Sequence, residues 1–214
     1  MKTTMPYQFP RSSRCRCAAG RLLLALALLL CASAGAQELL KNGNFEAPFP
    51  GSDATTNWTL VYVDGGPSDF AIAGQTTEAS RAGGGRGAHL RANNYNFAHA
   101  YFKQLVRTGI TNGGHYNLTI QKMKAGFASY VGNPPETGKL RVFMTAISGT
   151  WSTNVYGNAD VVGPYSVIVT GSPSRSIEIQ LHMAKDWMPA EVAEDPKHMK
   201  CTGWFDDISL TWAP

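Results

Sequence analysis

The chain ends on the stretch Gly203-Trp204-Phe205-Asp206-Asp207-Ile208-Ser209-Leu210-Thr211-Trp212, in which two adjacent acids interrupt an apolar, aromatic-rich pattern. After the acids, apolar side chains alternate with Ser209 and Thr211. A period of two is typical of a β-strand with one buried face. We therefore predict a closing strand that buries Ile208, Leu210 and Trp212, with the acid pair at its entry.

The rest of the chain repeats this alternation in short segments separated by Gly, Pro, Asn and Ser. The segments run from Trp58 to Tyr62, Phe70 to Ile72, His89 to Arg91, Tyr101 to Val106, Tyr116 to Ile120, Leu140 to Met144, Tyr165 to Val169 and Ile177 to Met183. No long stretch has helical periodicity, although a short helix fits Ala190 to Glu194, and Trp151 to Tyr165 has the composition of a loop. The pattern predicts an all-β protein, a two-sheet antiparallel β-sandwich.

Residues 1–36 differ in composition from the rest of the chain. Several arginines precede an apolar run from Leu22 to Cys31, which is too short to span a bilayer. Ala34-Gly35-Ala36 then fits the small-residue cleavage site of a secretory signal peptide. We predict a signal peptide over 1–36 and one domain over 37–214, secreted from the cell or released into the periplasm. A retained membrane anchor is the alternative.

Removal of this segment changes the charge of the chain. The full sequence has 19 basic and 15 acidic residues, and cleavage removes five of the basic residues and no acid, so the net charge falls from +4 to −1. The mature domain therefore lacks the basic footprint of a nucleic-acid-binding protein. It also keeps a single cysteine, Cys201, which excludes an intrachain disulfide and leaves a buried thiol or pairing between chains. We expect a monomer without a membrane span.

Three ordered motifs carry a resemblance to a known family. They are Leu39-Leu40-x-Asn42-Gly43-x-Phe45-Glu46, then Gly114-x-Tyr116-x-Leu118-Thr119, and finally Trp204-Phe205-Asp206-Asp207-Ile208-Ser209-Leu210. In this order and in a chain of this length, the motifs resemble the carbohydrate-binding modules appended to cellulases and xylanases. The resemblance implies the galactose-binding-like β-jelly-roll fold, with the first and last strands as neighbours.

The resemblance also implies a structural calcium ion between the two chain ends. Its ligands would be Glu46 and Asp206, with Asp207 as the substitute for Asp206. Carboxylates and backbone carbonyls are the ligands that Ca²⁺ prefers, and such a site would join the ends of a domain without disulfides. The alternative is that the acid pair is a solvated strand start that discourages edge pairing, and that Glu46 is an ordinary surface acid.

Sugar recognition in modules of this kind implies aromatic side chains that cover the apolar faces of sugar rings, aided by polar groups that bond to hydroxyls. The aromatic candidates outside the core stripes are Trp151, Tyr156, Trp187, Tyr95 and Tyr101. Glu178, Gln180 and His182, which alternate with the longest apolar stripe, are the polar candidates. Aromatic residues of a β-sandwich more often serve packing, and we assign Trp58, Trp204 and Trp212 to the core.

The sequence carries no signature of a catalytic site. It has no Gly-x-Ser-x-Gly, His-Glu-x-x-His or Cys-x-x-Cys motif, and the acids include no pair placed to flank a glycosidic bond. We predict a secreted, non-catalytic domain that binds a poly- or oligosaccharide. The alternatives are an exported structural or adhesive jelly roll without sugar binding and, third, a polysaccharide-active enzyme. Convergence of Trp151, Tyr156 and Trp187 on one surface would favour the binder.

Overall fold

The computed structural model describes residues 37–47, 57–66, 70–76, 85–92, 97–126, 140–157, 163–185 and 202–214. Its strands are β1 (Thr59–Asp64), β2 (Phe70–Thr76), β3 (Gly87–Ala92), β4 (Ala98–Val106), β5 (His115–Ala125), β6 (Leu140–Ser148), β7 (Trp151–Tyr156), β8 (Tyr165–Thr170), β9 (Ile177–Lys185) and β10 (Thr202–Ala213). Within these ranges no helix has the length and apolar character needed to cross a membrane. The predicted signal peptide, the short helix at Ala190 to Glu194 and Cys201 lie outside the described residues.

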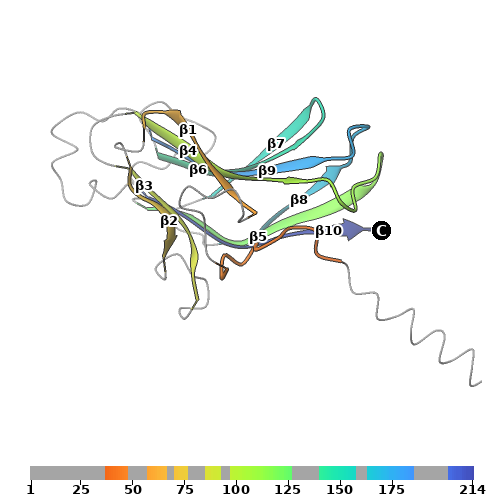
Figure 1. The fold of residues 1–214 in the computed structure, drawn as a ribbon, viewed down its shortest axis with the longest axis horizontal. Coiled ribbons are helices and arrows are strands. Elements are labelled where there is room, and N and C mark those ends of the chain that lie inside the picture. The colour runs from red at the N-terminus through yellow and green to blue at the C-terminus, as the bar shows by residue number, and fades with distance from the viewer. Residues whose placement is uncertain are drawn as a thin grey trace, which may run out of the picture. The chain divides into compact units, whose positions relative to one another are not determined.

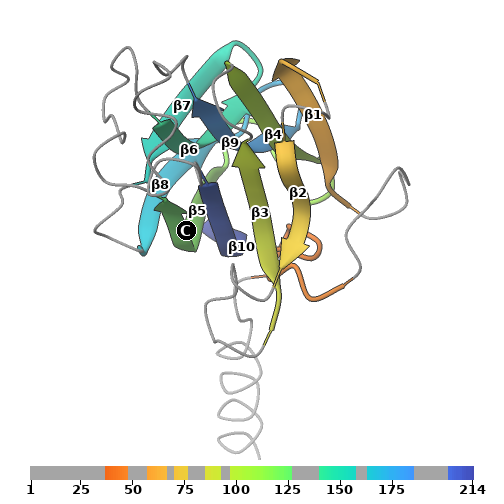
Figure 2. The same cartoon turned by 90° about the vertical axis from the view of Figure 1, so that its left-hand side faces the viewer.

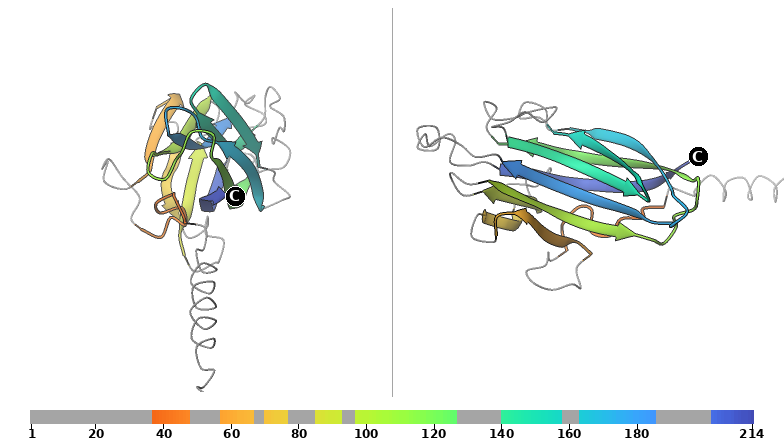
Figure 3. Two further views of the ribbon diagram at one scale, coloured as in Figure 1. Left: turned by 90° about the vertical axis from the view of Figure 1, so that its right-hand side faces the viewer. Right: turned by 90° about the horizontal axis from the view of Figure 1, so that it is seen from above.

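The strands form two antiparallel sheets that lie as separate layers (Figure 1). One sheet has the order β1-β4-β9-β6-β7 and the other has the order β2-β3-β10-β5-β8. In Figure 2 the second sheet lies below the first, and Figure 3 shows the two layers from two further sides. Among the described strands, only β2–β3 and β6–β7 are sheet neighbours that also follow each other in sequence. This architecture confirms the predicted all-β sandwich of jelly-roll type.

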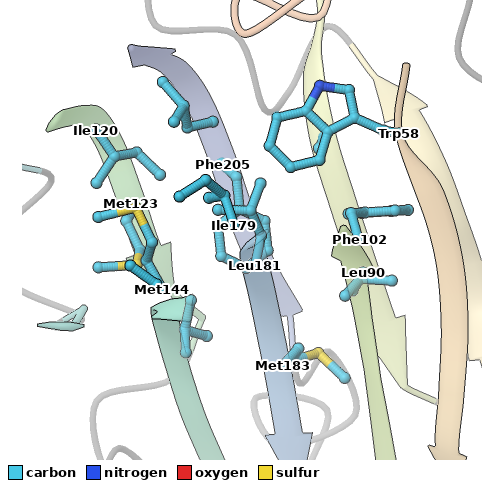
Figure 4. Close-up of a cluster of buried hydrophobic side chains, with 14 of the residues drawn as sticks. Trp58, Leu90, Phe102, Ile120, Met123, Met144, Ile179, Leu181, Met183 and Phe205 are labelled. Atoms are coloured by element: carbon cyan, nitrogen blue, oxygen red, sulfur yellow. The ribbon is translucent and has the colours of Figure 1, made fainter. Parts of the chain in front are cut away.

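The core lies between the sheets and follows from the period-two patterns. In β9 the inward side chains are Ile177, Ile179, Leu181 and Met183, and all of them are fully buried. Phe102 on β4 and Phe205 on β10 reach the same layer, as Figure 4 shows. Because each strand sends alternate side chains inward, the intervening residues of β9 and its neighbours face away from the core.

The two ends of the domain meet beside β10. The backbone N–H of Leu39 donates to the carbonyl of Leu210, and the N–H of Ile208 donates to the carbonyl of Gly43, both at 2.9 Å. A Cβ at Gly43 would collide with the carbonyl oxygen of Ile208, which explains the glycine in the Asn42-Gly43-Asn44 turn. These contacts attach the start of the domain to its closing strand.

Two sequence predictions are wrong in detail. The segment that begins at Trp151 is not all loop, because its first six residues pair with β6 as strand β7. Trp212 is not a core residue, since its side chain is 46% exposed at the end of β10, where it packs edge-on against the buried Tyr116 at 5.3 Å. Trp204 is also partly exposed and stacks on His89.

Trp58 lies in the core, as predicted, and a substitution there tests how much its packing stabilises the fold. Its side chain is 1% exposed, lies 5.3 Å from the Phe45 ring and donates its indole N–H to the carbonyl of Asn42 at 3.1 Å. We expect Trp58→Ala to lower the free energy of unfolding by about 3–5 kcal/mol, the usual cost of such a cavity. Denaturant unfolding measures the change. The matched control is Trp212→Ala, and equal losses in the two variants would contradict the assignment.

Candidate functional site

The candidate site is the outer sheet face, meaning the side of the sheet β1-β4-β9-β6-β7 that points away from the other sheet. Cross-strand pairing aligns its side chains in rows. The aromatic row consists of Val61, Tyr101, His182, Phe143 and Tyr156, and the polar row beside it consists of Thr59, Lys103, Gln180, Thr145 and Asn154. Each row takes one residue from every strand, so residues far apart in the sequence become direct neighbours.

Ring contacts run continuously along the aromatic row. The ring centroids of Tyr101 and His182 lie 4.6 Å apart, and those of His182 and Phe143 lie 4.4 Å apart with the two rings nearly parallel at 4°. Tyr156 continues the series at 5.4 Å from Phe143. From β4 to β7 the row spans about 14 Å, given the usual spacing of neighbouring strands. The outer sheet face therefore presents an extended aromatic surface across four strands.

A chain of hydrogen bonds crosses this surface along β9. His99 Nε2 lies 3.0 Å from His182 Nδ1, and His182 Nε2 lies 2.8 Å from the side-chain oxygen of Gln180. The Gln180 amide nitrogen donates to the carboxylate of Glu178. Lys103 lies 3.9 Å from the same carboxylate. These hydrogen bonds thus link His182 in the aromatic row to the ion pair between Glu178 and Lys103.

The carboxylate at the end of this chain determines the tautomers of the two histidines. A carboxylate only accepts hydrogen bonds, so the amide nitrogen of Gln180 must face Glu178 and its oxygen must face His182. His182 then donates through Nε2, and in the neutral imidazole its Nδ1 accepts the proton that His99 Nε2 donates. Both ring nitrogens of His182 are therefore engaged within the protein.

Burial keeps both imidazoles neutral. It lowers the pKa of His182 to about 3, and the nearby His99 contributes in the same direction. Burial is also the largest influence on His99 and lowers its pKa. The charge of Asp64 opposes this decrease in pKa, and the charge of Arg141 adds to it. Only 6% of His182 is exposed, although it belongs to the outer sheet face, because neighbouring rings crowd around it. Near neutral pH, the centre of the site is thus uncharged.

The polar row carries groups suited to hydroxyl contacts. Thr145 donates its hydroxyl proton to the side-chain oxygen of Asn154 at 2.7 Å. The amide nitrogen of Asn154 takes no part in this bond. Arg141 lies two residues before Phe143 on the same side of β6 and supplies a cation at the edge of the aromatic row. The face therefore combines aromatic rings with amide, hydroxyl and charged groups.

The structure brings together five of the residues predicted from the sequence as ligand contacts. Tyr101, Tyr156, Glu178, Gln180 and His182 all lie on the outer sheet face. Tyr95 and Trp187 lie outside the described residues.

Trp151, in contrast, lies elsewhere. It is placed opposite the buried Ser148 at the turn between β6 and β7. Trp151 and Tyr156 lie five residues apart on β7 and face opposite sides of the strand, so the convergence expected of a binder is not found for this pair.

Sequence reasoning missed His99, Phe143, Arg141 and Lys103 as members of this face. A signal for Phe143 and Arg141 was present, because Leu140, Val142 and Met144 form a core stripe and the residues between them must face outward. The pairing of His99 with His182 had no such signal. It arises because β4 and β9, which are far apart in the sequence, are adjacent in the sheet.

Two of the acids predicted to bind calcium, Glu46 and Asp206, lie near the start of β3. One carboxylate oxygen of Glu46 accepts the backbone N–H of Arg86 at 2.9 Å. Asp206 is 3% exposed and follows Phe205, which pairs with Ala88 on β3.

Nearby, the carbonyls of Phe45 and Ala47 converge on the Gln75 amide nitrogen. Carboxylate and carbonyl oxygens are the kinds of ligand that Ca²⁺ prefers. Asp207 has a left-handed backbone (φ 52°) and lines a separate hollow with Asn44 and Gln121.

Comparison with solved structures finds the same fold in a carbohydrate-binding module and in an enzyme domain. The chain matches TmCBM61, solved with β-1,4-galactotriose, at 11% identity and a TM-score of 0.50, over 83% of this chain and 100% of that one. It matches the enzymatically active domain of tailspike protein 4 of bacteriophage CBA120 at 12% identity and a TM-score of 0.50, over 82% of this chain and 21% of that one.

A family 11 carbohydrate-binding module of a Clostridium thermocellum cellulosomal cellulase matches at 10% identity and a TM-score of 0.43, over 84% of this chain and 97% of that one. No protein-family model and no curated protein matches the chain. At these identities, the shared property is the fold.

The depressed pKa of His182 predicts how stability changes with pH. The unfolded chain protonates this imidazole near pH 6.5, whereas the folded domain keeps it neutral down to about pH 3. Between these values the unfolded state binds the extra proton, so the free energy of unfolding should fall by up to about 1.4 kcal/mol per pH unit as the solution is acidified.

Denaturant unfolding of the wild type and of His182→Gln across this range measures the effect. The variant lacks the titrating group, so the stability difference between the two proteins should shrink as the pH falls. A difference that stays constant would contradict the assignment.

Proposed function

We propose that this protein is a secreted, non-catalytic carbohydrate-binding domain that holds a poly- or oligosaccharide on its outer sheet face. The observation that carries the proposal is the aromatic row with its neighbouring polar row, which runs across adjacent strands. The jelly-roll fold, shared with carbohydrate-binding modules, agrees with this proposal.

The two rows supply the two kinds of contact that a sugar chain needs. The rings of Tyr101, Phe143 and Tyr156 can cover the apolar faces of sugar rings, while Asn154 and Lys103 can bond to hydroxyls. His182 and Gln180 hold each other and Glu178 in one fixed arrangement, which reduces the ordering cost on binding. A rigid surface of this kind suits a ligand with repeating neutral rings.

The positions of the acids argue against hydrolysis of glycosidic bonds on this face. Within the described strands, the outer sheet face has two carboxylates, Asp64 on β1 and Glu178 on β9. Asp64 is at the level of Ala184, six residues along β9 from Glu178, so the two acids lie about 20 Å apart or more. Glycosidases need their two carboxyl groups within about 5–9.5 Å of each other.

Export is supported by the amino-terminal segment. Arginines, an apolar run of limited length and Ala34-Gly35-Ala36 occur in the order of a cleaved signal peptide. A polysaccharide-binding domain meets its ligand outside the cytoplasm, so this location agrees with the proposed ligand.

Binding to glycans tests the proposal directly. We expect the mature domain to bind at least one oligosaccharide in a glycan array or by calorimetry, and Tyr101→Ala and Tyr156→Ala each to weaken that binding about tenfold, through loss of ring contact. The matched control is Ile168→Ala, whose exposed side chain belongs to the other sheet. Absence of binding by the folded protein to every glycan would overturn the proposal.

We also propose a structural calcium ion held by Glu46 and Asp206, with backbone carbonyls of the Phe45–Ala47 segment as further ligands. Bound there, Ca²⁺ would link the start of the domain to β10 and β3. Asp207 is the substitute ligand, and its place in a separate hollow makes it the weaker candidate.

Chelation tests the calcium site. We expect excess EDTA to lower the melting temperature by about 5 °C or more, because removal of a tightly bound ion withdraws its binding free energy from the folded state. Glu46→Gln should melt at the lower temperature and lose its sensitivity to EDTA. Asp64→Asn, which removes an exposed acid elsewhere, should stay sensitive. Equal melting curves with and without EDTA would overturn the site.

A further inference from the structure

A cavity of about 650 Å³ lies where the turn between β6 and β7 meets the turn between β8 and β9. Its lining comes from two short segments, 148–151 and 170–174, and none of the lining residues carries a formal charge. A volume of this size falls within the range of about 300–1,000 Å³ that small-molecule sites occupy. The cavity belongs to neither row of the outer sheet face.

The walls of the cavity are held together by their own contacts. The backbone N–H of Ser172 donates to the hydroxyl of the buried Ser148 at 2.9 Å, which ties the two turns to each other. Gly149 has a left-handed backbone (φ 64°), and a Cβ there would lie 3.0 Å from the Cβ of Ser172. Gly171 also bonds to the turn before β5, through its N–H to the carbonyl of Gly114 at 2.8 Å. The cavity is therefore formed before any ligand arrives.

The lining combines one large aromatic surface with hydroxyl groups. Trp151 is 43% exposed, so much of its indole surface is open to a ligand. Pro173 adds a second apolar surface, and the hydroxyls of Thr150, Ser172 and Ser174 can both donate and accept hydrogen bonds. Ser172 and Ser174 are already ordered by a 2.6 Å bond between their hydroxyls.

We propose that this cavity is a second saccharide-binding site, which takes one neutral sugar residue with its apolar face on the indole of Trp151. An indole covers the face of a sugar ring, and serine and threonine hydroxyls match the mixed donor and acceptor character of sugar hydroxyls. The uncharged lining favours a neutral sugar over a uronic acid or a sulfated sugar, whose charge would find no counter-charge among the lining residues.

The second site is separate from the outer sheet face. Trp151 lies five residues before Tyr156 on β7, which places the two side chains on opposite faces of the strand and about 17 Å apart along it. No residue of the cavity lining belongs to the aromatic or polar row. The two sites can therefore be occupied, and tested, independently.

Titration followed by NMR distinguishes the sites. The probes are galactose, glucose, xylose, mannose and glucuronate, together with β-1,4-galactotriose and xylohexaose, added to the folded mature domain labelled with ¹⁵N. The indole N–H signal of Trp151, assigned by its loss in Trp151→Phe, reports on the cavity. The backbone amide signals of Tyr101 and Tyr156 report on the outer sheet face.

We expect at least one neutral sugar to shift the Trp151 signal with saturable binding, and glucuronate to leave it unchanged. Trp151→Ala should weaken that binding at least tenfold, whereas Tyr156→Ala should leave it within about twofold. The matched control is Trp212→Ala, which removes an indole of similar exposure outside the cavity.

Each result decides one proposal without deciding the other. Shifts confined to Tyr101 and Tyr156 would overturn the second site and leave the outer-face proposal standing, and shifts confined to Trp151 would do the reverse. A Trp151 shift that persists with equal affinity in Tyr156→Ala but disappears in Trp212→Ala would overturn the assignment to the cavity.

Discussion

The pairing of β9 with β4 on one side and β6 on the other is the constraint on which both the core and the candidate site depend. The inward side chains of β9, from Ile177 to Met183, fill the space between the sheets. Its outward side chains Glu178, Gln180 and His182 form the centre of the outer sheet face. A shift of one residue in the register of β9 would exchange these two sets, so the burial of the apolar stripe also fixes the position of the polar residues.

The hydrogen-bond chain on that face shows how one charged group orders several neutral ones. The carboxylate of Glu178 sets the orientation of the Gln180 amide, which sets the tautomer of His182, which in turn receives the proton of His99. Buried polar groups are costly unless they are paired, and here each member satisfies the next. The result is an aromatic surface whose centre is rigid and uncharged near neutral pH.

Aromatic residues divide the molecule into regions with different roles. Trp58 belongs to the core, the aromatic row belongs to the outer sheet face, and Trp151 belongs to the cavity between two turns. The sequence predicted the first assignment from the apolar pattern. It listed Trp151 and Tyr156 together as ligand candidates and left open whether they converge, because it did not show that both lie on one strand at positions of opposite parity.

The sequence by itself determined the fold class, the core stripes and the alternation that turns Glu178, Gln180 and His182 away from the core, because side-chain direction in a strand follows from a period of two. It also contained the signal for Phe143, which alternates with a recognisable core stripe. Only the tertiary structure decided which strands are neighbours, and hence the His99–His182 pair, the rows across the sheet and the cavity at Trp151. These depend on contacts between strands far apart in the chain, and no local pattern encodes their partners.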